Sequence, residues 1–237
     1  EMESLRHVHI NDRAAFILDD NKLETRCVLG NLDTLSTPVL RPGRATEKIM
    51  RRLPKLRKLR CIFMESWNFP VLDVLTSLES LKIFYHGRVA YPCKFSFPAN
   101  LKKLTLSKFR LPWTEISTIG RLPNLQSLKL LFKAFEGREW EPKKGEFQNL
   151  KYLKLDKLDI AQWKASNDHF PSLEQLVLQR CTQLEEVPLS FGEIPTLQII
   201  EVHWCAEAAA ISVKKIEEEQ RDSGNEELKV LISGLEI

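Results

Sequence analysis

Residues 173–188 carry the pattern that decides the fold, and they read LEQLVLQRCTQLEEVP. The leucines at 173, 176 and 178 have the spacing Leu-x-x-Leu-x-Leu. Successive side chains of a strand point to opposite sides, so Leu176 and Leu178 share one face, which we expect to be buried. The alternate positions should face outward: Gln175, Val177 and Gln179. The segment therefore predicts a short strand, followed by a turn in which Cys181 packs as a small hydrophobe.

The same spacing returns along the whole chain. It begins at nine leucines, 22 to 27 residues apart: Leu5, Leu32, Leu56, Leu78, Leu101, Leu125, Leu150, Leu173 and Leu197. A period of about 20–29 residues with this spacing is the signature of leucine-rich repeats. We therefore predict an α/β leucine-rich-repeat solenoid, a horseshoe with short parallel strands on its concave side and an irregular convex side.

The segments between the predicted strands differ from repeat to repeat. Residues 46–53 predict a short helix, and residues 113–122 are a weaker candidate. The apolar face of the first helix would consist of Ile49, Met50 and Leu53. Residues 88–97 and 136–148 predict loops, since they contain glycine, proline and charged residues.

The C-terminal segment predicts a helical cap. Residues 206–222 have an amphipathic pattern, with one apolar stripe formed by Ala206, Ala209, Ala210, Val213 and Ile216. Gly224 and Asn225 end this helix, and residues 228–232 predict a last strand. We therefore divide the chain into about nine repeats over 1–205 and a cap over 206–237. Because the pattern begins by Leu5, with no capping helix before it, we expect the chain to be a piece of a longer solenoid or receptor.

Composition excludes several classes of function. The net charge of +3 is too small for general nucleic-acid binding, and no apolar run is long enough to cross a membrane. The five cysteines include no C-x-x-C pair, there is no N-glycosylation motif, and the common nucleotide-binding and hydrolase motifs are absent. His7 and His9 have the spacing to share a metal, but we interpret them as solvated surface residues. We predict a cytoplasmic, non-catalytic protein without a resident metal or cofactor.

The strand register predicts a basic stripe on the concave face. Its cations stand at outward positions of successive strands: Lys58, Arg60, Lys82, Lys103, Lys129 and Lys154. Neighbouring strands lie about 4.8 Å apart, so these charges repel one another unless an anion lies among them. Inositol hexakisphosphate is one candidate, an acidic protein loop is a second, and a hydrated face that binds nothing is a third. Several aromatic residues follow the strands and either add contact area or pack under loops: Phe63, Phe84, Tyr85, Phe132 and Trp204.

A second basic segment covers residues 41–60, which hold nine cations against a single acid, Glu47. Such a run is most often a solvated face. Alternatively, it pairs with an acidic surface of a neighbouring domain. The candidate interdomain residues are Arg51, Arg52, Arg57 and Lys58.

Several short motifs resemble one family of repeat proteins. They are residues 111–116 (LPWTEI), 120–125 (GRLPNL), 134–137 (AFEG), 140–141 (WE), 35–38 (LSTP), 56–63 (LRKLRCIF) and 204–207 (WCAE). Together they resemble the repeat domain of plant nucleotide-binding leucine-rich-repeat (NLR) immune receptors with an N-terminal coiled coil, in the solanaceous late-blight-resistance and helper groups. The resemblance extends over essentially the whole chain.

The resemblance implies a regulatory domain. In this family the repeats hold the upstream nucleotide-binding module inactive with ADP until a pathogen effector, or a partner immune receptor, releases it. ATP exchange and oligomerisation then trigger defence and local cell death. The nucleotide-binding motifs have no counterpart in this chain, so they are expected upstream. The alternative is the substrate-receptor half of an F-box ubiquitin ligase, which an upstream F-box would distinguish.

Overall fold

The computed structural model describes residues 5–9, 29–40, 44–64, 69, 72–87 and 96–234. The chain forms two compact units, residues 1–106 and 107–237.

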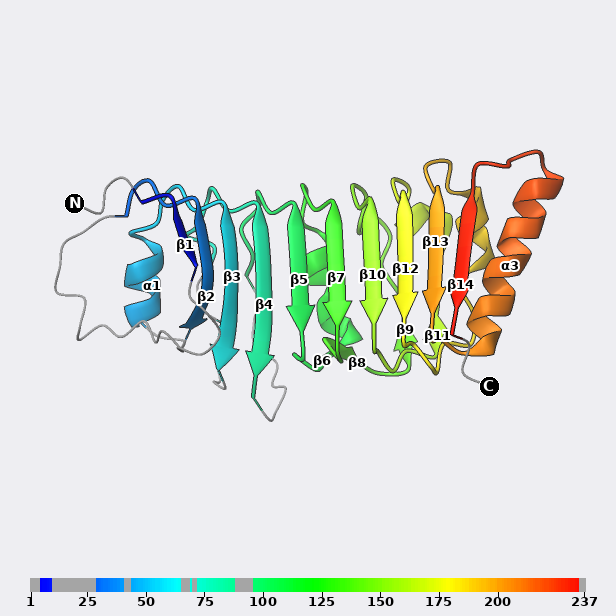
Figure 1. The fold of residues 1–237 in the computed structure, drawn as a ribbon, viewed down its shortest axis with the longest axis horizontal. Helices are drawn as coiled ribbons and strands as arrows, with labels where there is room; N and C mark the ends of the chain where they lie inside the picture. Colours follow the sequence, from blue (N-terminus) through cyan, green and yellow to red (C-terminus); the bar gives the residue numbers. More distant parts are fainter. Residues whose placement is uncertain are drawn as a thin grey trace. The chain divides into compact units, whose positions relative to one another are not determined.

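The described residues of the first unit include five strands, which follow one another in the sheet in chain order (Figure 1). They are β1 (His7–His9), β2 (Thr34–Leu40), β3 (Lys58–Met64), β4 (Ser80–His86) and β5 (Lys103–Ser107). The first four are parallel, and Ser36, Arg60 and Lys82 align across β2, β3 and β4. The inward leucines of these strands are buried, which confirms the register predicted from the repeat pattern.

The predicted short helix is present as α1 (Arg44–Met50), beginning and ending slightly earlier than expected. Its predicted apolar residues Ile49, Met50 and Leu53 are all buried. The loop predicted for residues 88–97 falls mostly outside the described residues, because 88–95 are not among them.

The second unit has a parallel sheet of the same kind. Its strands, in order, are β7 (Ser127–Leu131), β10 (Tyr152–Asp156), β12 (Gln175–Gln179), β13 (Ile199–His203) and β14 (Lys229–Ser233). Leu130, Leu155 and Leu178 align with one another and are fully buried. Each inward apolar side chain thus packs on its equivalent one repeat away.

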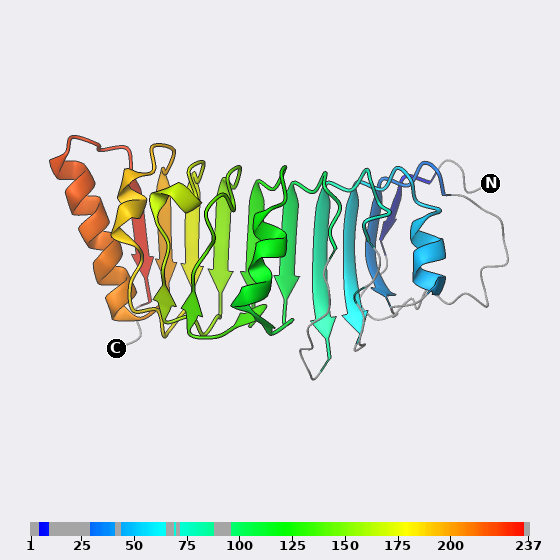
Figure 2. The ribbon, with the colours of Figure 1, turned by 180° about the vertical axis from the view of Figure 1, so that it is seen from behind.

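Short irregular elements occupy the other side of this sheet (Figure 2). Two small parallel pairs form, β6 (Leu111–Pro112) with β8 (Phe135–Glu136), and β9 (Glu139–Trp140) with β11 (Gln162–Trp163). The helical turns are η2 (Trp113–Ile116), α2 (Ser117–Gly120), η3 (Asn167–His169) and η4 (Leu189–Glu193). The weaker helix candidate is therefore one turn of 3-10 helix followed by one α turn.

The loop prediction for residues 136–148 is wrong in part, because Glu139 and Trp140 form β9. The physical reason is the Trp140 side chain, which is fully buried and stacks between Trp113 and Trp163. Burial of this large indole outweighs the glycine and proline residues nearby.

The predicted cap is present as α3 (Glu207–Asp222) followed by β14. Ala209, Ala210, Val213 and Ile216 are buried as predicted, whereas Ala206 precedes the helix and is half-buried. Ser212 is an additional buried contact: its hydroxyl donates to Ala209 O and accepts from Val187 N–H, at 2.8 and 2.9 Å. The chain leaves α3 through Gly224, whose φ of +87° favours glycine.

Candidate recognition surface

The first unit presents four of the predicted cations on the outward face of its sheet. Lys58, Arg60, Lys82 and Lys103 are all exposed. Arg60 and Lys82 are aligned neighbours on β3 and β4, and the Arg60 guanidinium lies 5.2 Å from the centre of the Phe84 ring. This cation–π contact holds one cation against the sheet, while Lys82 extends into solvent.

The edge where these strands begin carries a row of ion pairs. Arg57 Nη2 lies 2.9 Å from Glu79 Oε2, and Lys102 Nζ lies 3.3 Å from the other oxygen of Glu79. The hydrogen bond from Arg57 lowers the pKa of Glu79, and the Lys102 hydrogen bond adds to this effect. Both pairs are largely exposed, so they fix side-chain positions more than they stabilise the fold.

Two of the predicted interdomain cations therefore have carboxylate partners within the chain: Arg57, and Arg51, whose guanidinium lies 2.7 Å from Glu47. Arg52 is half-buried and Lys58 is exposed. Arg57 also lines a hollow of about 500 Å³ together with Arg6, Lys55 and Asp33. Lys55 and Arg57 belong to the same basic segment, but the sequence pattern did not connect Arg6 with them, because Arg6 belongs to a different repeat.

The second unit holds the remaining predicted cations, Lys129 and Lys154, side by side on β7 and β10. Both are half-buried. Lys129 Nζ lies 5.0 Å from the centre of the Tyr152 ring, and Lys154 Nζ donates to Gln179 Oε1 over 2.7 Å. Burial raises the pKa of Tyr152, with a further contribution from Glu201.

Val177 lies on the outward face of β12 as predicted, yet it is buried. Its position in the register is as predicted, between Lys154 and Glu201, but only 4% of the residue is exposed. The long side chains beside it bond over it: Lys154 reaches Gln179, and Gln175 donates to Glu201 over 2.6 Å. The short Val177 side chain thus lies among longer side chains that are hydrogen-bonded to one another.

One residue just after each of four strands has a left-handed backbone conformation, which the repeat pattern did not reveal. The four residues have φ between 49° and 56°: Phe132, Lys157, Arg180 and Trp204. Each amide donates to a strand carbonyl of the next repeat, as Arg180 N–H does to His203 O over 2.8 Å. This regular bonding compensates for a conformation that is uncommon outside glycine. The four side chains therefore occupy equivalent places along one edge of the sheet.

Arg180 is held rigidly within that row. Its Nε and Nη2 donate to the two carboxylate oxygens of Asp156 over 2.9 and 2.8 Å, and Asp156 is buried. The guanidinium carbon lies 5.3 Å from the centre of the Phe132 ring. A bidentate pair with a buried carboxylate, together with stacking on a ring, preorganises an arginine for contact with a partner.

The aromatic residues predicted to follow the strands differ in place and in burial. Phe63 and Tyr85 lie within β3 and β4 and are buried, because these strands extend further than the repeat pattern indicated, whereas Phe132 is 38% exposed and Trp204 is 49% exposed. Beside Trp204, His203 contacts Glu201 Oε2 at 3.1 Å and Ser233 Oγ at 2.7 Å. The second unit thus presents aromatic, cationic and hydrogen-bonding groups within a few strands of one another.

The described thiols and the two N-terminal histidines lie apart from these contacts. Cys61, Cys181 and Cys205 are free and buried, and burial raises the pKa of the Cys61 thiol. His7 and His9 are exposed, as predicted. Within the described ranges, no group of three or more His, Cys, Asp or Glu side chains is placed to hold a metal ion. No helix in the same ranges is both long and apolar enough to span a membrane.

Parallel strands at intervals of one repeat, with aligned inward leucines, define the chain as an α/β leucine-rich-repeat solenoid. Its homologues are late blight resistance proteins. The chain is 39% identical over 245 residues to the putative late blight resistance protein homolog R1B-16 of Solanum demissum. This alignment covers 100% of this chain and 19% of that protein. It is 37% identical over 242 residues to homolog R1B-23 of the same species, covering 98% of this chain and 19% of that protein.

The late blight resistance protein R1-A of Solanum demissum is also similar, at 37% identity over 240 residues, with 98% of this chain and 18% of that protein covered. These matches confirm the resemblance predicted from the short motifs. The chain spans about a fifth of the length of these relatives. No family model matches the chain. A solved leucine-rich-repeat protein of Leptospira interrogans has a more distant similarity, with 15% identity and a TM-score of 0.40 over 85% of this chain and 61% of that chain.

Proposed function

We propose that the chain is the recognition and restraint region of an intracellular plant immune receptor, acting in the cytoplasm by binding rather than by catalysis. The observation that carries the proposal is the homology, over nearly the whole chain, to late blight resistance proteins. All three relatives described above are resistance proteins, which favours a receptor over the repeats of an F-box ubiquitin ligase.

Restraint is assigned to the basic segment of the first unit. Arg51, Arg52, Arg57 and Lys58 would contact an acidic surface of the upstream nucleotide-binding module, which itself would hold ADP or ATP. The ion pairs of Arg51 and Arg57 leave both side chains more than half exposed. Opposite charges on two such surfaces attract, and the attraction weakens as salt screens it.

Recognition is assigned to the outward faces of the sheets. The second unit offers Lys129 and Lys154 together with Arg180, flanked by the exposed rings of Phe132 and Trp204. Arginine and tryptophan are enriched among the residues that dominate binding energy at interfaces. An acidic loop of a pathogen effector or of a partner receptor would suit this set of groups. An inositol polyphosphate is the small-molecule alternative, on this face or on that formed by Lys58, Arg60, Lys82 and Lys103.

Two assays test the restraint. In a binding assay with the nucleotide-binding module supplied in trans, Arg57→Glu with Lys58→Glu should weaken its association with this chain, most clearly at low salt. In the full receptor, expressed in leaf tissue, the same two substitutions should raise cell death in the absence of a pathogen. The matched control is Lys214→Glu with Lys215→Glu, which reverses two adjacent exposed cations on α3. Unchanged association, or equal effects of the two pairs, would contradict the assignment.

The polyanion is tested with the purified chain. Inositol hexakisphosphate should raise the melting temperature in proportion to the logarithm of its concentration, because it binds the folded state. Lys129→Glu with Lys154→Glu should remove the part of this increase that arises in the second unit, without unfolding the chain. Calorimetry that detects no binding at moderate salt would eliminate the polyanion and leave the acidic protein loop.

A further inference from the structure

Three tryptophans from consecutive repeats stack face to face in the second unit. The ring centroids of Trp113 and Trp140 lie 4.6 Å apart with planes inclined by 12°, and those of Trp140 and Trp163 lie 5.1 Å apart with planes inclined by 8°. Trp140 and Trp163 are aligned partners of β9 and β11. All three indoles are buried, so the stack extends the core from one repeat to the next.

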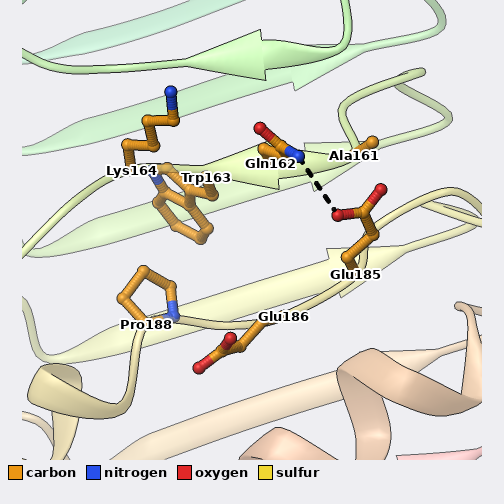
Figure 3. A pocket seen from close by; sticks show the side chains of 7 residues that line it. All are labelled: Ala161, Gln162, Trp163, Lys164, Glu185, Glu186 and Pro188. Carbon is orange, nitrogen blue, oxygen red and sulfur yellow. Dashed lines mark hydrogen bonds between the residues drawn. The ribbon is translucent and has the colours of Figure 1, made fainter.

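The face-to-face stack ends at Trp163, whose ring meets Phe191 of the next repeat edge-on, with ring centroids 5.0 Å apart. In the next repeat, the amide of Glu185 donates to Ala161 O over 2.9 Å, which places residues 185–188 beside β11. This segment reads Glu-Glu-Val-Pro and contains no aromatic residue. A hollow of about 370 Å³ lies between the two segments, with Trp163 and Pro188 in its wall (Figure 3). Its size is within the range of about 300–1,000 Å³ found for ligand sites.

The hollow is lined by one cationic side chain, Lys164, and two carboxylates, Glu185 and Glu186. Lys164 Nζ lies 2.6 Å from Glu139 Oε1, and this hydrogen bond raises the pKa of Lys164. In Figure 3 the Lys164 ammonium points away from Glu186 and Pro188. Lys164 is therefore neutralised by a carboxylate outside the hollow.

Two carboxylates remain on the opposite wall. Glu185 has weak partners, Arg138 at 3.6 Å and the Gln162 amide at 3.5 Å. Glu186 is exposed and pairs with no residue in the described part of the chain. The hollow thus combines an indole rim, a proline ring and one uncompensated negative charge.

We propose that this hollow binds the guanidinium group of an arginine side chain supplied by a protein partner. A guanidinium is planar, stacks on aromatic rings and bonds to a carboxylate through two parallel N–H groups. The Pro188 ring and the small exposed part of the Trp163 indole would contact its flat face, and Glu186 would accept its hydrogen bonds. One bound cation compensates the one unpaired carboxylate, whereas an anion would meet two carboxylates at the same place.

Arginine fits better than lysine for a geometric reason. An ammonium is compact and strongly hydrated, so it gains less from a flat apolar wall. This site is chemically distinct from the basic sheet faces, and it does not depend on the immune function proposed for the chain.

The test uses the 237-residue chain and two small probes, N-acetyl-arginine methylamide and its uncharged citrulline analogue. The readout is the indole N–H signal of Trp163 in a proton–nitrogen correlation spectrum, assigned with Trp163→Phe. Trp163 Nε1 is buried without a hydrogen-bond partner among the described residues, so its signal reports on the ring alone. The arginine probe should shift this signal to saturation. The citrulline probe should bind more weakly by about threefold or more, because it lacks the charge.

Glu186→Gln should weaken binding of the arginine probe by a similar factor, about threefold or more, since it removes the same ion pair. Glu218→Gln is the matched control, because Glu218 is an exposed residue of α3 outside the hollow. It should leave the titration unchanged. Equal shifts from the arginine and citrulline probes, no saturation, or equal effects of the two variants would overturn the proposal.

Discussion

Leu176 and Leu231 are the same residue type on opposite faces of one sheet. Leu176 is fully buried, whereas Leu231 is 53% exposed and aligns with Glu201 on the outward face. Leu176→Ala should reduce the free energy of unfolding by about 2–5 kcal/mol, because it removes core contacts and leaves a cavity. Leu231→Ala should cost less than about 1 kcal/mol. Urea denaturation measures both, and equal losses would show that the assigned faces are wrong.

Glu79 provides a prediction about pH. Its hydrogen bond from Arg57, followed by that from Lys102, holds its pKa below the usual value for glutamate. A lowered folded-state pKa means that the stabilising contribution is present above the unfolded pKa and is lost as the pH falls through the folded one. In a carbon NMR titration of the Glu79 carboxyl group, Arg57→Gln should raise the midpoint.

Lys102→Gln is the comparison for that titration. It should raise the midpoint less, since Arg57 is the larger cause of the shift. A midpoint that Arg57→Gln leaves unchanged would contradict the ion pair. The pair is exposed, so the global stability should change little in either variant.

At the scale of the element, α3 is attached to the repeats by one buried polar contact as well as by its apolar stripe. The Ser212 hydroxyl accepts the Val187 N–H over 2.9 Å. Ser212→Ala should cost about 1–3 kcal/mol, because a buried amide loses its acceptor. Ser223→Ala, at the exposed end of the same helix, should change stability by no more than about 0.5 kcal/mol. Thermal melts measure the loss of stability in each variant, and similar losses would argue against this contact.

The strands were predictable because leucine spacing fixes both their position and their register. Arg60 and Lys82 lie where the pattern placed them, and so do Lys129 and Lys154. The pair β9 and β11 was not predictable, since two residues are too few to show a period. Burial of Trp140 in the indole stack decided that structure.

The candidate site was predictable only in part. The sequence placed the cations but not their partners, because Lys154 with Gln179 and Arg180 with Asp156 join different repeats. Arg180 itself was missed since it lies just beyond the Leu-x-x-Leu-x-Leu pattern. A signal was present: Phe132, Lys157, Arg180 and Trp204 each stand two residues after the last inward residue of a strand.

At the scale of the whole molecule, a solenoid transmits a local defect mainly to adjacent repeats. Each repeat contacts only its neighbours, so stability is close to a sum of local and nearest-neighbour contributions. Here β12 is bonded to β10 and β13, and the chain forms two compact units. The loss expected for Leu176→Ala should therefore be uneven along the chain.

Hydrogen exchange under native conditions measures that distribution. In Leu176→Ala, amides of β10, β12 and β13 should exchange faster by about tenfold or more, since each 1.4 kcal/mol of lost local stability changes the open population tenfold. Amides bonded between β3 and β4, in the first unit, should keep most of their protection. Leu231→Ala is the control and should leave both sets nearly unchanged. If all strands lost protection equally, the chain would unfold as one cooperative block, and binding at one unit would be expected to stabilise the other to the same extent.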